Sequence, residues 1–439
     1  MTKRVLVVGG GFTGLTAAHR LAASGVTVVV AEKSESLGGL AGGFSLGGHS
    51  LEKTYHHLFR SDRDILDLCQ ELALGDQLEW LPSSIAVHRD GVFHPFATPK
   101  DLLAFKPLPF LSRVRLGMVV AFLQRWRSGR SLERSPASQW MRKTCGLAAW
   151  QTLWQPLLRG KFSTHAEEVS MAWLWARIHI RANSREAGSS GEKLGYFKSG
   201  FACVTTALEA RIRANKGVLR THTPLRRLIR AENSWLADLN GSVEEFDDVV
   251  FTGSCRAFAN LLLESEVDTK AGYLDQLRSI KYLGAACLVF TYPEPLTEAY
   301  WNNMNEPDCP FLVLLTHTRL APCERYGGRH VHYLGNYHTS EDTVANADSR
   351  AVSEAWLSWL ARAVKGFDPA RIEESHFFRF RDAQHVADVG YASRIPPYQT
   401  PYPGLWLANF AQIYPEDRGT NYAVREGNRI ARLILETAR

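Results

Sequence analysis

The first aliphatic run of the chain, residues 3–8, ends abruptly at three consecutive glycines. A continuous run of this kind predicts a parallel strand that is buried on both faces. Across residues 14–23 the apolar positions recur at helical spacing, and Ser24-Gly25 predicts the end of that helix. A second aliphatic run, residues 27–31, follows. The pattern therefore predicts a strand, a helix and a second, parallel strand within about thirty residues.

The loop between the first strand and the helix has the spacing Gly-x-Gly-x-x-Gly, formed by Gly9, Gly11 and Gly14. The first glycine permits a tight turn, the second lets the backbone approach a pyrophosphate, and the third lets the helix pack against the strand. The pyrophosphate would then be held by amides at the helix N-terminus, where Phe12 and Thr13 lie. The loop therefore predicts a dinucleotide-binding site.

Glu32 ends the second predicted strand, about twenty residues beyond the loop. Its carboxylate is placed to accept hydrogen bonds from the ribose hydroxyls of an adenosine, and its charge repels a ribose phosphate. The strand, loop, helix and acid together disfavour NADP. By themselves they admit either NAD or FAD.

Composition narrows the class of protein. The 439 residues are 45% hydrophobic and 22% charged, as in ordinary globular proteins, and the length suits two or three domains. The formal net charge of +6 is mild and the Lys and Arg residues are scattered, which argues against nucleic-acid binding. Seven widely spaced cysteines without a Cys-x-x-Cys pair indicate neither a disulfide framework nor a zinc site. We therefore expect no metal and a reducing, cytoplasmic setting.

Residues 102–126 are rich in large apolar side chains and are interrupted by Lys106, Arg113, Arg115 and Arg125. A basic and strongly apolar segment can lie on a membrane surface, so peripheral membrane contact is one interpretation. A helix packed inside a substrate-binding domain is the other. No uninterrupted apolar run reaches the length of about 18 residues that predicts a membrane-spanning helix.

A second pair of glycines, Gly38 and Gly39, follows Glu32 and Lys33 and precedes Leu40. This spacing resembles the flavin amine oxidase superfamily, which includes protoporphyrinogen oxidase, phytoene desaturase and, more distantly, UDP-galactopyranose mutase. The resemblance implies that the second pair wraps the diphosphate of FAD, where a Cβ would clash. It therefore selects FAD over NAD.

The end of the chain carries the same resemblance. Residues 404–408 and 422–431 resemble the closing FAD motif of the family, a short strand and a helix whose N-terminus favours the anionic reduced flavin. The chain departs from the family at Asn409-Phe410, where the family usually has Gly-Asp and the acid holds the ribityl chain; either Asn409 or Asp417 is a candidate replacement for that acid. The other expected FAD contacts are Asn421, Tyr422 and Ala423, together with Leu225 from a third matching region at 200–252.

The resemblance implies an α/β fold with a Rossmann-type FAD-binding domain of the glutathione-reductase-like, amine oxidase type. This domain is expected to be discontinuous and to consist of residues 1–85, 195–265 and 385–439. The two intervening segments are the expected substrate-binding part, with a helical cap at 86–194 and an inserted α+β substrate-binding sheet at 266–384.

In this superfamily the segment after the second glycine pair passes beside the flavin ring, which makes His56 and His57 candidate catalytic groups. Imidazole titrates near neutral pH and can move a proton while hydride goes to flavin N5. The alternative is that one ring only hydrogen-bonds to backbone or ribityl oxygens. If the stretch is extended, only one of the two can face the flavin, because neighbouring side chains alternate.

Aromatic and cationic residues supply candidate substrate contacts. Trp173 and Arg177 are four residues apart and would share a helical face that could hold a substrate with ring and anionic parts. Core tryptophans with surface arginines are the plainer alternative. Tyr300 and Arg381 are further candidates for substrate contact.

We expect an FAD-dependent oxidoreductase that transfers hydride from an organic substrate to flavin N5, most like protoporphyrinogen oxidase or a phytoene-type desaturase. Residues 285–290 lack the lysine that many amine oxidases keep on that strand, which disfavours oxidation of a simple amine. The C-terminal region has no cysteine for a covalent flavin, so FAD should be noncovalent. No second glycine fingerprint for NADPH follows the first, which leaves oxygen, a quinone or another electron acceptor. The alternatives are a flavin-dependent sugar-nucleotide isomerase like UDP-galactopyranose mutase and a non-catalytic flavin-binding protein.

Overall fold

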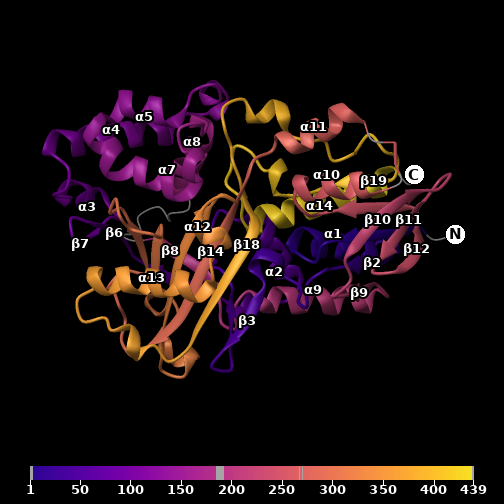
Figure 1. The fold of residues 1–439 in the computed structure, drawn as a ribbon, viewed down its shortest axis with the longest axis horizontal. Helices are drawn as coiled ribbons and strands as arrows, with labels where there is room; N and C mark the ends of the chain where they lie inside the picture. The colour runs from indigo at the N-terminus through magenta and orange to yellow at the C-terminus, as the bar shows by residue number, and fades with distance from the viewer. Residues whose placement is uncertain (1–2, 184–191, 266, 269, 438–439) are drawn as a thin grey trace.

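The computed structural model describes residues 3–183, 192–265, 267–268 and 270–437. Figure 1 shows three parts: a nucleotide-binding part that contains the N- and C-terminal ends, a group of helices at the far upper side, and a second sheet below those helices. The mixed α/β architecture, with a parallel sheet flanked by helices, confirms the predicted fold class.

The nucleotide-binding part is built on a parallel sheet with the strand order β19-β13-β1-β2-β9. As the sequence pattern predicts, β1 and β2 are adjacent and parallel, with Arg4 opposite Thr27 and Val8 opposite Ala31. The elements in and around this sheet are β1 (Arg4–Val8), α1 (Phe12–Ala23), β2 (Thr27–Ala31), α2 (Arg63–Glu71), α9 (Ala202–Ala214), β9 (Val218–Arg220), β10 (Leu225–Arg230), β11 (Trp235–Leu239), β12 (Ser242–Phe246), β13 (Asp248–Phe251), α10 (Cys255–Glu264), α11 (Ala271–Ser279), β19 (Leu405–Leu407) and α14 (Thr420–Thr437).

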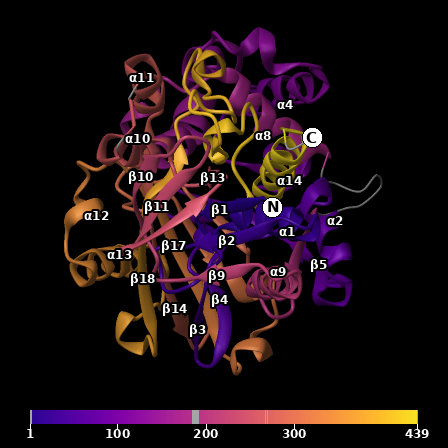
Figure 2. The ribbon, with the colours of Figure 1, turned by 90° about the vertical axis from the view of Figure 1, so that its right-hand side faces the viewer.

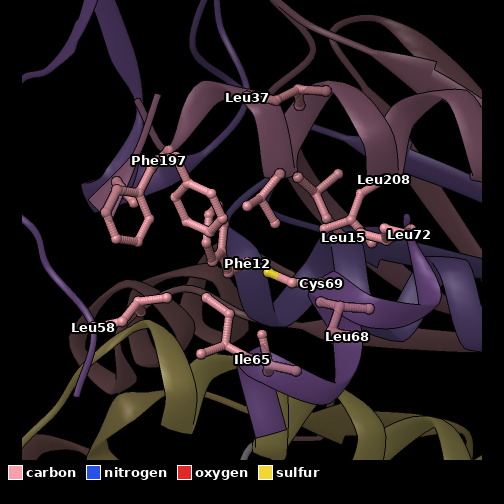
Figure 3. Packing of buried hydrophobic residues seen from close by; sticks show 14 of the residues in the cluster. Phe12, Leu15, Leu37, Leu58, Ile65, Leu68, Cys69, Leu72, Phe197 and Leu208 are labelled. Atoms are coloured by element: carbon pink, nitrogen blue, oxygen red, sulfur yellow. The ribbon is translucent and has the colours of Figure 1, made fainter. Parts of the chain in front are cut away.

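The central strands are continuously apolar because their alternate residues belong to two different cores. Val5 and Val7 of β1 enter a core shared with α1, α9 and α14, whereas Leu6 enters another shared with α10 and the antiparallel strands β10 to β12. Figure 3 shows part of the first core, in which Phe12 and Leu15 of α1 lie among side chains of α2 and α9. In Figure 2, α14 lies along α1 over the sheet, and the two helices are in contact.

The second sheet has seven strands in the order β18-β14-β17-β16-β15-β6-β7. Its long strand β14 is buried throughout and pairs antiparallel with β17 and β18. Alternate residues of β14 face α13 on one side and the core of the nucleotide-binding part on the other. The elements of this part are β6 (Ile85–Arg89), β7 (Val92–Pro95), β14 (Tyr282–Tyr292), β15 (Trp301–Met304), β16 (Val313–Thr316), β17 (His330–His338), α12 (Thr343–Asn346), α13 (Ser349–Ala363) and β18 (Ser375–His385).

The helices at the upper side of Figure 1 form a cap with a core of its own, in which Trp150 and Trp173 are fully buried. The segment 86–194 is not entirely helical, because β6 and β7 join the seven-stranded sheet through a parallel pairing of β6 with β15. No local sequence pattern predicts this pairing, because it joins strands that are far apart along the chain. The cap helices are α3 (Pro99–Ala104), α4 (Phe110–Arg125), α5 (Ala137–Cys145), α6 (Leu147–Ala149), α7 (Gln155–Phe162) and α8 (Met171–Asn183).

Two small antiparallel pairs connect these parts. The hairpin of β3 (Gly43–Leu46) and β4 (His49–Glu52) leads directly into the stretch that carries the candidate histidines, and β5 (Leu78–Ser83) pairs with β8 (Glu192–Phe197). Within the described ranges, no helix is both long enough and apolar enough to cross a membrane.

Candidate flavin and substrate site

The glycine loop forms a cradle that leaves no room for side chains. A Cβ on Gly14 would lie 2.0 Å from the carbonyl oxygen of Gly9, and a Cβ on Gly39 would lie 3.0 Å from the Cα of Gly11. Gly9 and Gly39 also have positive φ angles, of 107° and 59°, which residues other than glycine rarely adopt. These positions therefore require glycine for steric and conformational reasons.

The two glycine pairs meet at the start of α1. The amide of Gly38 donates to the carbonyl oxygen of Gly10 at 2.8 Å, which closes the second pair against the first. Helix α1 begins at Phe12 without a side-chain cap, so the amides of its first turn, including that of Thr13, are available to an anion. Leu40, in the turn after the second pair, is tied to the next stretch by the hydroxyl of Thr54, which donates to its carbonyl oxygen at 3.0 Å.

Glu32 is buried at the end of β2, and backbone amides hold its carboxylate. Oε2 accepts from the amide of Gly10 at 2.7 Å, and Oε1 accepts from the amide of Ser34 at 2.8 Å. Each carboxylate oxygen has a further lone pair, which suits the two hydroxyls of a ribose. The amide of Thr223 donates to the carbonyl oxygen of Glu32 at 2.8 Å and brings β10, with Leu225 at its start, beside this corner. The neighbouring Lys33 side chain is exposed.

A pocket lies where the three parts meet. Asn421 and Tyr422 line it from the start of α14, and Ala423 follows them in the first turn of that helix. The side-chain oxygen of Asn421 also accepts from the amide of Ile65 at 3.1 Å, near the start of α2. The rest of the lining comes from residues 54–62, α7, α8, β14, β15, Leu312, β17 and the loop before α14.

His56 and His57 both line this pocket. Nδ1 of His56 lies 2.7 Å from the carbonyl oxygen of Thr54, and because a carbonyl only accepts, this nitrogen carries the proton and Nε2 is left as the acceptor. Nδ1 of His57 lies 3.3 Å from the hydroxyl of Tyr300. Burial lowers the pKa of His56 to about 4 and that of His57 to about 3, so both rings are neutral at pH 7. Strand β4 ends at Glu52, so the alternation that would turn one ring away does not extend to the histidines.

The two candidate ribityl contacts, Asn409 and Asp417, are both engaged by the protein. The side-chain amide of Asn409 is buried and bonds to two nearby backbone groups, at 2.8 and 2.9 Å. Asp417 Oδ2 pairs with Lys161 Nζ at 2.8 Å and with Arg177 Nη1 at 2.9 Å. Burial alone would raise the pKa of Asp417, but the charges of Lys161 and Arg177 hold it well below its usual range.

Arg418 and Tyr337 extend this ion-pair cluster. Arg418 Nη2 donates to the Tyr337 hydroxyl at 3.1 Å, and Lys161 Nζ lies 5.1 Å from the centre of the Tyr337 ring. Burial raises the pKa of the Tyr337 phenol, but the charges of Lys161 and Arg418 outweigh it and hold the pKa below its ordinary value of 10.0. The nearby Tyr55 has a pKa well above that value, mainly because of burial. Tyr337 is therefore the more acidic of the two phenols.

A model of the flavin containing amine oxidoreductase family matches residues 12–435, nearly the whole chain. The chain belongs to this family. No curated protein matches the chain significantly.

Solved structures share the fold of this flavin amine oxidoreductase at low sequence identity. A candidate protoporphyrinogen oxidase from Exiguobacterium sp. has a TM-score of 0.77 and 20% identity, with 99% of each chain covered. Cyclohexylamine oxidase from Brevibacterium oxydans has a TM-score of 0.74 and 15% identity, with 100% of each chain covered. A reduced UDP-galactopyranose mutase has a TM-score of 0.75 and 16% identity, covering 99% of this chain and 96% of that one.

The cofactor of this flavin amine oxidoreductase is FAD. The observed donor set fits it, because the cradle has uncapped helix amides for a diphosphate and Glu32 has a carboxylate positioned for a ribose. When bound, FAD supplies N5 as the acceptor of hydride.

The four candidate substrate contacts have different environments. Arg177 reaches the pocket, whereas Trp173 is fully buried and lies under two cations, with Lys161 Nζ 5.6 Å from its ring centre. Tyr300 is buried and reaches His57 through its hydroxyl. Arg381 is exposed on β18 and is not part of the pocket lining.

Lys161, Tyr337 and Arg418 line the pocket of this flavin amine oxidoreductase, although none of the three is among the predicted site residues. The adjacency of Arg418 to Asp417, just before the closing helix, is the one local signal that could have indicated a charged loop at the flavin end. Nothing in the sequence near Tyr337 distinguishes it from other strand tyrosines. Its acidity depends on charges supplied by α7 and by the loop before α14.

Proposed function

We propose that this enzyme oxidises an organic substrate that carries a carboxylate or phosphate group, by transfer of hydride to flavin N5, in the manner of a protoporphyrinogen oxidase. The observation that supports the proposal is the excess of positive charge in the pocket. Four basic side chains line it, Lys161, Arg177, Arg181 and Arg418, against two acidic ones, Asp62 and Asp417. Asp417 forms ion pairs with Lys161 and Arg177. Guanidinium groups bind such anions through paired, charge-assisted hydrogen bonds. A protonated simple amine would be repelled at this position.

The strand that faces the pocket also argues against a simple amine. The residues that β14 contributes to the lining are Ala285, Ala286 and Cys287, none of which is a lysine. Lys281, which precedes the strand, instead forms ion pairs with Glu168 and Asp388. The position at which many amine oxidases keep a lysine therefore has small, uncharged side chains here.

The reaction also needs an acceptor for a proton. Oxidation of a C–H or C–N centre removes one hydride, which carries both electrons, and one proton. A base is most effective when its pKa lies near the working pH. The charges of Lys161 and Arg418 hold the pKa of Tyr337 below its ordinary value and so favour the phenolate, whereas burial makes the His56 ring a weak base with a pKa of about 4. We propose that Tyr337 accepts the proton from the substrate and that His56 and His57 are neutral hydrogen-bonding groups beside the flavin.

The test is anaerobic mixing of the FAD-loaded enzyme with tetrapyrrole carboxylates, isoprenoid diphosphates and simple amines. We expect an anionic substrate to bleach the visible absorption of the flavin. In Arg177→Met the KM for that substrate should rise by roughly tenfold to a hundredfold, since a charge-assisted hydrogen bond contributes about 1.5–3 kcal/mol. The matched control is Arg381→Met, because that arginine lies outside the pocket lining. Bleaching by a simple amine and by no anion would contradict the proposal.

The same charges favour one second candidate, an isomerase that acts on a sugar nucleotide. The diphosphate of such a substrate would suit Lys161, Arg177 and Arg418. In that chemistry the reduced flavin N5 attacks a sugar carbon as a nucleophile and no net oxidation occurs. Turnover that requires prior reduction of the flavin and consumes no electron acceptor would favour this candidate over an oxidase.

A further inference from the structure

Helix α4 of the cap is apolar on two opposite faces, and within the part of the chain that the structure describes only one of these faces is covered. Leu116 and Leu123 are buried in the cap core. On the other side, Leu111 is 79% exposed, Met118 63% and Phe122 53%. Their spacing of seven and four residues places them in one stripe along the helix. A helix that is apolar all round is expected to be covered on every side, but none of the described residues covers this stripe.

The exposed apolar surface extends beyond the helix itself. Arg113 Nη1 donates to the carbonyl oxygen of Leu103 at 2.5 Å, which places the exposed Leu103 beside the start of α4. Arg115 lies against Gly146, and the next residue, Leu147, is 61% exposed. We call this surface the α4 face; it comprises Leu103, Phe110, Leu111, Met118, Phe122 and Leu147. It contains six of the eleven large apolar side chains that are exposed in the described structure, which makes it a patch rather than isolated residues.

The net charge of the segment that carries the α4 face is strongly positive. Between Lys100 and Leu147 there are ten Lys and Arg residues and two acids, Asp101 and Glu133, which gives a formal charge of +8. The whole chain carries +6, so the remainder of the chain is slightly acidic. Both acids are already engaged, Asp101 in the cap of α3 and Glu133 with the amide of Ala392. Ten of the 51 Lys and Arg residues lie in this range, but only two of the 45 acids do, so the net positive charge of the chain is concentrated in this part of the cap.

We propose that the α4 face docks the enzyme onto a bilayer of anionic lipids, with α4 lying in the plane of the membrane surface. An apolar stripe with basic residues around it matches the acyl chains and the headgroups of such a bilayer respectively. A second copy of the chain fits less well, because two strongly basic faces would then have to meet. The charge therefore identifies the occupant as a lipid surface.

The position of the α4 face gives the docking a functional consequence. α4 lies at the outer side of the cap, far from the two ends of the chain (Figure 1). It packs against α8, the helix that carries Arg177 to the pocket. Docking would therefore bring the cap side of the pocket close to the lipid, where substrates with large apolar parts, or a quinone, are concentrated.

The test is cosedimentation of the FAD-loaded enzyme with vesicles. One set of vesicles is phosphatidylcholine alone, and the other contains equal parts of phosphatidylcholine and phosphatidylglycerol. We expect binding to the mixed vesicles that weakens as salt is added, because exposed charges are screened. The double variant Leu111→Glu/Met118→Glu should lower the partition constant by about tenfold or more, since each charged side chain opposes entry into the interface.

Two further variants control for folding and for charge. Val243→Glu/Leu263→Glu places the same charges at exposed apolar positions outside the cap, and it should bind as the wild type does. Arg125→Gln/Arg127→Gln keeps every apolar residue of the α4 face and should lose binding to anionic vesicles only. Undiminished binding by the α4 double variant would overturn the proposal. The proposal would also be overturned if light scattering showed the wild type to be a dimer and the α4 double variant to be a monomer, while neither protein bound vesicles.

Discussion

Glu52 is fully buried at the end of β4, and its environment changes how readily it ionises. Oε1 accepts from the amide of Phe201 at 2.6 Å and Oε2 accepts from the Tyr196 hydroxyl at 2.8 Å. Burial outweighs these hydrogen bonds and raises the pKa of Glu52 from 4.5 to about 7. The carboxyl group ties the stretch before the histidines to the start of α9. The sequence contains no local pattern that marks it.

The raised pKa of Glu52 predicts a specific dependence of stability on pH. The folded state binds this proton more tightly than the unfolded state, so the contribution of Glu52 to stability is greatest below the unfolded pKa and is lost as the pH rises through the folded value. Relative to Glu52→Gln, the free energy of unfolding of the wild type should fall by roughly 2–3 kcal/mol between about pH 5 and pH 8. Urea unfolding at each pH measures this difference. The control Glu341→Gln, at an exposed position, should track the wild type at every pH.

Glu32 gives a prediction for cofactor affinity. The variant Glu32→Ala removes the carboxylate that two backbone amides hold at the end of β2. FAD affinity should fall by about tenfold to a hundredfold, because hydrogen bonds to a charged group contribute about 1.5–3 kcal/mol. Quenching of flavin fluorescence in a titration measures the Kd. Glu35→Ala, three residues along the chain and exposed, is the matched control; equal losses in the two variants would contradict the role of Glu32.

Tyr337 gives a prediction for catalysis. If its phenol accepts the proton, kcat/KM should rise with pH as the phenol ionises, and Tyr337→Phe should lower kcat/KM by about a hundredfold and remove that rise. Stopped-flow reduction of the flavin across pH measures the effect, and the Kd for FAD serves to show that the cofactor site is unchanged. If kcat/KM of Tyr337→Phe still rose with pH and His56→Gln lost most of its kcat/KM, His56 and not Tyr337 would be the proton acceptor.

At the residue scale, sequence reasoning reaches furthest where the local geometry depends on neighbours along the chain. The glycine cradle and Glu32 belong to this class, because their geometry is set by one turn and the strands around it. The assignment of Asn409 depended on where its amide points, and the structure turns that amide toward nearby backbone. The structure gives no support to Arg381 as a substrate contact, because its side chain is exposed to solvent on β18.

At the element scale, the contact between α1 and α14 links the two ends of the chain. A Cβ on Gly427 would lie 2.6 Å from the carbonyl oxygen of Thr13 and 2.6 Å from Cβ of Thr16. The glycine therefore sets how closely the closing helix approaches the helix that carries the cradle. Local patterns predicted both helices, but the close approach between them is visible only in the fold.

The variant Gly427→Ala should force these two helices apart. We expect a loss of about 1–3 kcal/mol in the free energy of unfolding, as for other overpacked sites, with weaker FAD binding because Thr13 lies in the cradle. Gly272→Ala, on α11, is the control, since a Cβ there meets nothing within 4 Å and alanine favours a helix. A Gly427→Ala protein as stable as Gly272→Ala would show that the helices adjust freely. Thermal unfolding and FAD titration measure both effects.

At the scale of the whole molecule, the FAD cradle depends on a sheet whose strands come from three distant parts of the chain. Since FAD is expected to bind only when this sheet is assembled, binding should stabilise the fold. At a hundredfold excess of FAD over its Kd the gain is about 2.7 kcal/mol, which should raise Tm by a few degrees. FMN, which lacks the adenosine that we expect to bind at Glu32, should raise Tm less. Equal shifts with FMN and FAD in a thermal melt would contradict the assigned adenosine corner.

The sequence by itself determined the nucleotide-binding unit of this protein, because that unit depends on features that act over short stretches: strand burial, glycine sterics, helix amides and one acid. Only the tertiary structure decided the chemistry of the pocket. Lys161, Arg177, Tyr337 and Asp417 come from four separate elements, and they meet only after the cap, the second sheet and the closing loop are assembled. The pKa shifts of Tyr337 and Asp417, and the excess positive charge of the pocket, arise from burial and proximity, neither of which is encoded in local spacing.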